Sequence, residues 1–173
     1  VVCELAQKHE NIVGIKDTLD SISHTRELIA EVKNKLEREF AVFSGFDEYF
    51  LPNLLNGVHS YLYWNMVLEP GGESTWGWNQ NSMITVDPES QAVIYNPEFY
   101  LMKHFSNFVK RGAVRFGLKG SWNANALGFE NPDGEKIIII HNPFENLKTV
   151  NIKTNNKNIS VDLKPLSFNT IVF

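Results

Sequence analysis

The sequence has a single cysteine, no dense block of basic residues and no long apolar run. Cys3 cannot form a disulfide within the chain, and no Cys/His cluster has zinc-ligand spacing, so the sequence implies neither a metal site nor a cofactor. Lysine and arginine are densest at residues 33–38, where Glu37 interrupts them, and the net charge is -4 at pH 7. These observations argue against nucleic acid as a partner, and we interpret the basic stretch as a solvated helix face.

Membrane and export signals are also missing. No apolar run approaches the roughly 20 residues that a membrane-spanning helix needs, and residues 1–8 lack the layout of a signal peptide. The sequence therefore gives no basis for assigning a compartment. With 173 residues, of which 43% are hydrophobic, the chain is long enough to bury a core in one or two domains.

The N-terminal third alternates strand and helix patterns. A β-branched apolar run at residues 12–15 predicts a buried strand, and apolar residues at helical spacing predict a helix from a cap near Ser21 to Arg38. Residues 40–43 repeat the strand pattern, and residues 49–56 can form a second helix. Such alternation favours parallel strands joined by crossover helices.

The middle third continues with a third buried strand, predicted over residues 58–68. Residues 83–87 and 92–95 flank a turn and predict a hairpin. Pro97 opens an amphipathic helix that runs to about Val109. We expect this helix to bury its apolar side chains, which are Phe99, Leu101, Met102, Phe105 and Phe108.

The pattern changes beyond Gly112, because helices disappear and short strands follow one another between turn-forming residues. Six strands are predicted, at residues 113–118, 126–130, 136–141, 147–153, 158–163 and 167–173. This spacing is typical of an antiparallel sandwich or barrel. A domain boundary is expected near residues 110–112.

Lys16 occupies a suggestive position at the C-terminal end of the first predicted strand. In barrels of alternating strands and helices the chemistry lies on that face, and a lysine amine partly withdrawn from water can attack a carbonyl group. Alternatively, Lys16 only follows a strand and pairs with Asp17 or Asp20. The residues alone leave both interpretations open.

Two segments of the N-terminal third resemble the dihydrodipicolinate synthase and N-acetylneuraminate lyase family over residues 1–56. They are residues 12–18 (Ile-Val-Gly-Ile-Lys-Asp-Thr) and residues 44–48 (Ser-Gly-Phe-Asp-Glu). The resemblance implies that Lys16 forms an imine (Schiff base) with pyruvate and that Asp47 and Glu48 contact the substrate. Asp47 and Glu48 could instead supply negative charge at the start of the helix near Tyr49.

The family's catalytic set is incomplete in this sequence. The resemblance also calls for a proton-transferring tyrosine and a threonine-rich loop, both on strands expected upstream of residue 1. Without a general acid/base, proton transfer around an imine is not assisted. We therefore do not expect Lys16 alone to act as an aldolase.

The rest of the chain resembles glycoside hydrolase family 30, which includes glucosylceramidases. The matching features are residues 57–68 (with Tyr-Trp-Asn-Met), Trp76 with Asn79, and residues 84–87, 95–100 and 104–106. The resemblance implies a barrel followed by a β-sandwich. Residues 57–108 would then be the last βα unit of a barrel, and residues 109–173 the sandwich.

The residues expected to carry glycosidase chemistry are also missing. Such enzymes retain anomeric configuration with two carboxylates, which the resemblance places on strands that are not recognisable here. Glu48 lies too near the Trp-Asn strand to replace the nucleophile. Trp64, Trp76 and Asn79 match positions near the sugar subsite, although Trp64 could equally be a core residue.

The prediction is therefore an α/β plus all-β chain: a partial (β/α) TIM-barrel segment of about three strands, followed by an antiparallel β-sandwich. Its function is that of the C-terminal part of a retaining β-glycosidase joined to a class I aldolase fragment, inactive alone. The alternatives are a Schiff-base lyase and a non-catalytic carbohydrate- or partner-binding sandwich. A carbohydrate or sugar acid is the expected ligand, and a homo-oligomer could complete the open barrel segment.

Overall fold

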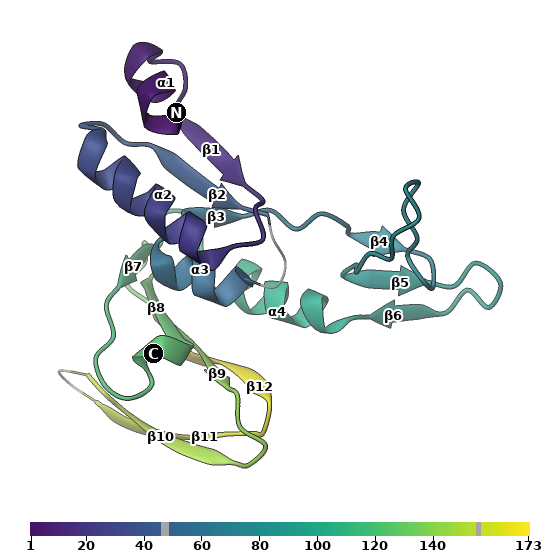
Figure 1. The fold of residues 1–173 in the computed structure, drawn as a ribbon. Coiled ribbons are helices and arrows are strands. Elements are labelled where there is room, and N and C mark those ends of the chain that lie inside the picture. The colour runs from purple at the N-terminus through teal and green to yellow at the C-terminus, as the bar shows by residue number, and fades with distance from the viewer. Residues whose placement is uncertain (46–48, 155–156) are drawn as a thin grey trace. The chain divides into compact units, whose positions relative to one another are not determined.

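The structure, a computed structural model, describes residues 1–45, 49–154 and 157–173. The chain divides into two compact units, Val1–Met66 and Val67–Phe173, each described by itself below. Figure 1 labels the helices and strands along the chain. No helix among the described residues is both long enough and apolar enough to cross a membrane.

The first unit alternates helices with parallel strands, as predicted. Its elements are α1 (Val2–Lys8), β1 (Gly14–Asp17), α2 (Ile22–Lys35), β2 (Ala41–Ser44), α3 (Phe50–Asn56) and β3 (Ser60–Tyr61). The strands form one sheet in the order β1-β2-β3, and both pairings are parallel. Ile15 lies beside Val42, and Phe43 lies beside Ser60.

Helix α2 begins as expected and ends early. Ser21 is its N-cap, and the Ser21 hydroxyl accepts a hydrogen bond from the His24 amide at 3.2 Å. The helix stops at Lys35 because Leu36 is extended. Arg38 consequently does not lie on a solvated helix face, and that interpretation was wrong for it. Its guanidinium donates to the carbonyl oxygens of Ala6 at 2.7 Å and Ile12 at 2.8 Å, satisfying backbone groups around the end of α1.

The core of the first unit lies between the helices and one face of the sheet. Its buried members are Cys3, Ala6, Leu28, Ile29, Val32, Phe40, Val42 and Val58, with Ile15 packed against them. Side chains alternate along a strand. Asp17 and Ser44, two positions beyond Ile15 and Val42, therefore face the helices, where they bond to Thr25 and Asn53. Lys16 projects from the opposite face.

The third predicted strand, residues 58–68, was wrong as a single element. It is divided into β3, which pairs with β2, and β4 (Val67–Leu68), which belongs to the second unit. The bond from the Leu62 amide to the Ser44 carbonyl, 2.8 Å long, is made at the last residue of β2. Beyond Leu62 the chain has no β2 residue left to pair with, so the strand ends.

The second unit begins with a small mixed sheet in the order β4-β5-β6, formed with β5 (Ile84–Val86) and β6 (Val93–Tyr95). Strands β5 and β6 are antiparallel, which confirms the predicted hairpin. The Asp87 carboxylate accepts bonds from the Glu89 and Ser90 amides, and Gln91 adopts a positive φ of 60° to close the turn.

Helix α4 (Pro97–Ser106) starts at the predicted proline but ends three residues before Val109. None of its residues is fully buried. The apolar side chains expected in a core are half-buried instead: Phe99, Leu101, Met102, Phe105 and, beyond the helix, Phe108. The helix covers a sheet on one side, through contacts such as the edge-to-face pair of Phe105 and Phe129, and leaves the rest of its surface open.

The six predicted C-terminal strands are all present. They are β7 (Val114–Phe116), β8 (Ala126–Glu130), β9 (Lys136–Asn142), β10 (Lys148–Lys153), β11 (Asn158–Leu163) and β12 (Ser167–Val172), with the short helix η2 (Asn123–Asn125) before β8. An antiparallel sheet in the order β12-β9-β8-β7 packs on the β10-β11 pair. Ala126, Ile138, Ile140, Val150 and Leu163 fill the space between them. The antiparallel sandwich is confirmed.

Candidate functional site

Lys16 lies at the C-terminal end of β1 on the face opposite the helices, and its side chain is exposed. The side chain passes directly over Gly45, where an added Cβ would come within 2.5 Å of the lysine Cε. Its ammonium nitrogen lies 5.2 Å from the ring centroid of Trp64, within the range of a cation–π contact. Lys16 and Trp64, which resemble site residues of two different families, are thus brought together within one unit.

The carboxylates next to Lys16 in the sequence have other partners. Asp17 is buried and accepts hydrogen bonds from the Thr25 hydroxyl at 2.8 Å and the Leu19 amide at 3.1 Å. Asp20 accepts a bond from the Tyr49 hydroxyl at 2.8 Å. Among the described residues, Lys16 forms no ion pair with either. Asp47 and Glu48, the predicted substrate contacts, lie outside the residues that the structure describes.

Trp64 is 67% exposed and is not a core residue. Trp76 and Trp78 are also exposed, on a loop of the second unit. Their rings are 5.9 Å apart and meet edge to face. The Ser74 hydroxyl accepts bonds from both of their amides, at 3.3 Å and 3.4 Å, so the loop holds two indoles toward solvent.

Asn79 closes this loop by bridging to Glu73, and it lines a mainly polar pocket of about 350 Å³. Asn96 also lines the pocket, and its amide donates to the Ser82 carbonyl at 2.8 Å and the Thr85 hydroxyl at 2.9 Å. Side-chain amides and hydroxyls at a shallow pocket suit sugar hydroxyl groups.

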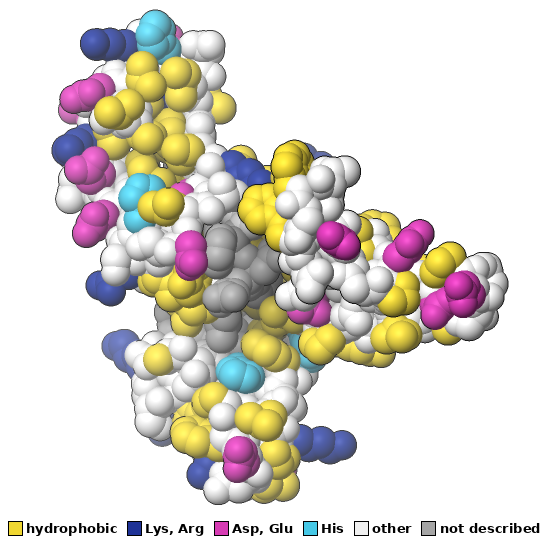
Figure 2. All heavy atoms as spheres, turned by 45° about the vertical axis from the view of Figure 1, so that its right-hand side comes forward, with side chains coloured by type: hydrophobic (Ala, Val, Ile, Leu, Met, Phe, Trp, Pro, Cys, Tyr) yellow, Lys and Arg dark blue, Asp and Glu magenta, His cyan; other side chains and the backbone are white. Residues whose placement is uncertain are grey.

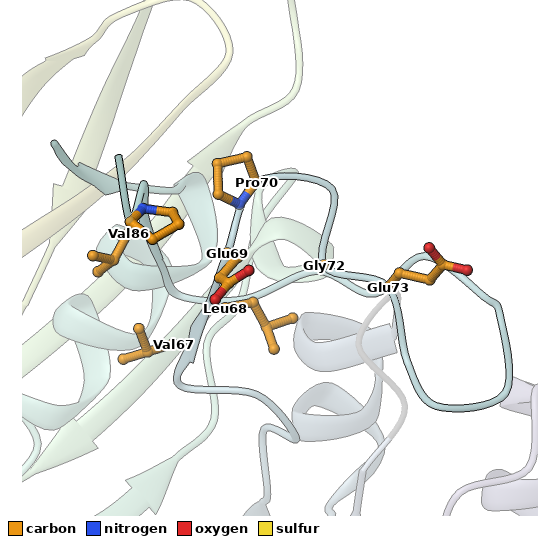
Figure 3. Close-up of a pocket in the computed structure, with 8 residues that line it drawn as sticks. Val67, Leu68, Glu69, Pro70, Gly72, Glu73 and Val86 are labelled. Atoms are coloured by element: carbon orange, nitrogen blue, oxygen red, sulfur yellow. The ribbon is translucent and has the colours of Figure 1, made fainter. Parts of the chain in front are cut away.

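A second hollow of the same unit, about 670 Å³, is lined by apolar residues and by two glutamates, Glu69 and Glu73. Figure 3 shows that Glu73 points away from Glu69 rather than across the hollow toward it. A retaining glycosidase needs two carboxyl groups about 5–5.5 Å apart on either side of the sugar bond. Glu69 and Glu73 do not form such a pair.

The histidines make structural contacts. The His59 ring accepts a bond from the Val42 amide at 3.2 Å. His141 stacks on Phe168 with ring centroids 4.4 Å apart, and His104 bonds to the Thr170 hydroxyl at 2.7 Å. Burial lowers the pKa of both His104 and His141. Within the described residues no three Cys, His, Asp or Glu side chains are placed to hold a metal ion.

Sequence reasoning missed two arrangements. One is the contact of Lys16 with Trp64, and the other is the group of His104, His141 and Phe168. Both join residues far apart in the chain and have no local sequence signal. Only the pairing of strands brings these side chains together.

Fold and site together define an α/β segment with a lysine at a strand end, followed by an antiparallel sandwich. The families are then identified separately for the two ends. Residues 1–66 match the model of the dihydrodipicolinate synthetase family. Residues 112–171 match the glycosyl hydrolase family 30 beta sandwich domain. Both predicted resemblances are confirmed, and the lyase match extends ten residues beyond the predicted limit, through β3.

Individual relatives come from both kinds of enzyme. The chain is 32% identical over 122 residues to a probable 2-dehydro-3-deoxy-D-pentonate aldolase of Escherichia coli, covering 68% of this chain and 40% of the relative. It is 33% identical over 95 residues to mouse lysosomal acid glucosylceramidase, covering 53% of this chain and 18% of the relative. This chain thus spans less than half the length of these relatives.

A solved structure resembles almost the whole chain. SrfJ from Salmonella typhimurium superposes with a TM-score of 0.77 at 20% identity, covering 99% of this chain and 44% of SrfJ. At this identity the likeness establishes the fold alone. Lyase-like and glycosidase-like segments therefore coexist in a chain whose fold has a counterpart among solved structures.

Proposed function

We propose that residues 1–173 are the C-terminal part of a retaining family 30-like β-glycosidase joined to a class I aldolase fragment, and that this chain alone turns over neither class of substrate. In this proposal the domains are residues 1–56, 57–108 and 109–173. The first two are remnants of a (β/α) barrel and the third is the sandwich.

One observation carries the proposal: the sheet that holds Lys16 has three parallel strands among the described residues. A (β/α) barrel closes with eight strands, and its reacting groups come from the ends of several of them. Three strands supply Lys16 and Trp64, but none of the described carboxylates beside Lys16 is free to act as nucleophile or acid. Asp17, the nearest along the chain, is buried and hydrogen-bonded on the helix side.

Hydrolysis of aryl β-glucoside, β-xyloside and β-fucoside substrates tests the proposal. We expect no turnover above the uncatalysed rate, because the paired carboxylates supply most of the acceleration in retaining enzymes. Glu69→Gln and Glu73→Gln variants serve as matched controls for any residual signal. Hydrolysis that either variant abolishes would contradict the proposal and assign that residue a catalytic role.

A Schiff-base lyase is the second candidate, favoured by the exposed amine of Lys16 at a strand end. The test is borohydride trapping with pyruvate, with Lys8→Ala as a control for nonspecific labelling of an exposed lysine. We expect weak labelling and no cleavage of N-acetylneuraminate, because the proton-transferring tyrosine that the lyase resemblance calls for has no recognisable counterpart in this sequence. Stoichiometric labelling that is lost in Lys16→Ala, together with turnover, would replace the first proposal by this one.

A further inference from the structure

Strand β6 is an edge strand with unusual exposure. It pairs with β5 on one side only in the described sheet, whose order is β4-β5-β6. All three of its residues are exposed: Val93 by 53%, Ile94 by 54% and Tyr95 by 49%. Apolar side chains on both faces of a free edge form a template for another strand. Figure 2 shows that hydrophobic side chains are exposed on the surface.

The hydrogen-bond pattern fixes which backbone groups are available. The Asp87 amide bonds to the Ala92 carbonyl at 3.0 Å, and the Asn96 amide bonds to the Met83 carbonyl at 2.9 Å. Backbone groups alternate in direction along an antiparallel strand. Ala92, Ile94 and Asn96 therefore face β5, whereas the N–H and C=O groups of Val93 and Tyr95 point outward.

We propose that β6 is a self-association surface, on which β6 of a second copy of this chain pairs in antiparallel register about a two-fold axis at Ile94. In that register Val93 of one copy lies opposite Tyr95 of the other, and vice versa. These are the two residues whose backbone groups point outward, so both copies donate and accept in the same way. A two-fold interface requires this self-complementarity.

The ends of β6 exclude the neighbouring registers. Pairing centred on Tyr95 would oppose Val93 with Pro97, which has no N–H to donate. Pairing centred on Val93 would oppose Tyr95 with Gln91, whose positive φ of 60° takes it out of the extended conformation. The register centred on Ile94 alone keeps all the outward groups paired within β6.

Charge and size define the kind of complex. No charged residue occurs from Gln91 to Pro97, so two copies of the strand meet without repulsion and without the edge lysine that often blocks such pairing. The nearest acidic residues, Glu89 and Glu98, lie outside β6, in the turn before it and in the first turn of α4. A contact limited to one short strand is far smaller than a permanent interface. The dimer is therefore weak and reversible.

This surface differs from the open edge of the parallel sheet, and it goes beyond the proposed function. Its test does not depend on turnover of any substrate. If the chain does not dimerise, the proposed lack of turnover still stands. If turnover is found, the proposed dimer still stands.

Sedimentation equilibrium of the full chain from about 10 µM to about 1 mM tests the proposal, since a weak complex of this size is expected to dissociate in that range. We expect a reversible monomer–dimer equilibrium. Ile94→Lys and Ile94→Asp should each weaken dimerisation at least tenfold, because residue 94 faces its own copy across the axis. Val114→Lys, at an equally apolar exposed position on edge strand β7, is the matched control and should leave the equilibrium unchanged.

Mixing the two variants gives the decisive arm. An equimolar mixture of Ile94→Lys and Ile94→Asp should form a heterodimer at least as well as the unmodified chain, since opposite charges then face each other. In a Cys3→Ala background, Ile94→Cys should form an intermolecular disulfide under mild oxidation, because directly opposed non-hydrogen-bonded residues lie about 4.5 Å apart at Cα. A chain that stays monomeric throughout, or a dimer that both charge variants leave intact, would overturn the proposal. The proposal would also be overturned if β6 bound unrelated strand-forming peptides in preference to a second copy of the chain.

Discussion

Strands β1 and β9 show how differently the two units bury their strands. In β1 only Asp17 is buried and Ile15 is half-buried, whereas in β9 the four consecutive isoleucines of residues 137–140 are all buried. The difference follows from neighbours. Strand β9 lies between β12 and β8 and is covered on both faces, whereas β1 is the edge of a three-stranded sheet.

Whether a strand is buried thus depends more on how many faces of its sheet are covered than on the strand's own residues. A continuous apolar run fits a strand that is covered on both faces. The second unit supplies both covers, the β10-β11 pair on one face and helix α4 on the other. The parallel sheet supplies one, because α1, α2 and their core cover a single face. We therefore expect the sandwich to be the more stable unit and the parallel sheet the less stable one.

The largest expected effect is truncation in the centre of β9, where Ile139 is completely buried. Ile139→Ala should lower the free energy of unfolding of the second unit by about 2–5 kcal/mol, the usual cost of a cavity in a packed core. Urea unfolding followed by NMR signals of both units measures it. Ile15→Ala, the matched truncation in β1, should cost less because that side chain is half-buried. Equal losses at the two positions would remove the distinction between the units.

A middle-sized effect is expected at Arg38, which ties α1 to the first unit. Arg38→Met should lower the stability of this unit by about 1–3 kcal/mol, because it leaves the carbonyl groups of Ala6 and Ile12 without their charged donor. Arg26→Met, at an exposed position of α2, is the control and should change little. Unchanged exchange of the α1 amides in Arg38→Met would show that the bonds contribute no stability.

A smaller effect is expected on how the stability of the second unit depends on pH. Burial lowers the pKa of His104 and of His141, and Lys103 contributes at His104. Above the ordinary histidine pKa of about 6.5 both are neutral in the folded and unfolded chain, so their contribution is constant. As pH falls through 6.5 the unfolded chain binds protons first, and stability decreases until the folded-state pKa values are passed. His104→Gln with His141→Gln should flatten this dependence in urea titrations, whereas His9→Gln should not.

The sequence predicted most elements because their patterns are local. Neighbouring residues in the chain determine the cap at Ser21, the proline that opens α4 and the six sandwich strands. The wrong predictions concern which strands pair with each other. Residues 58–68 were apolar enough for one strand, but β2 ends at Ser44 and leaves the second half to pair elsewhere.

The candidate site was predictable in identity and not in arrangement. Lys16 and Trp64 could be chosen from their motifs, and their cation–π contact depends on the parallel pairing of three strands and on the space above Gly45. The exposure of Trp64 likewise follows from where β3 ends. Asn79 was chosen by resemblance, while its companion Asn96 in the same pocket belongs to a matching segment, residues 95–100, but was not chosen as a site residue.

Native-state hydrogen exchange tests the central difference between the two units most directly. The amides of residues 137–140, in the middle of the four-stranded sheet, should be the longest protected in the chain. The amides of residues 12–15 should exchange early, and any protection that a second copy gives them should fall on dilution. Slow exchange of residues 12–15 that does not depend on concentration would contradict this account, because it would show that the three-stranded sheet is a closed and stable fold in the monomer.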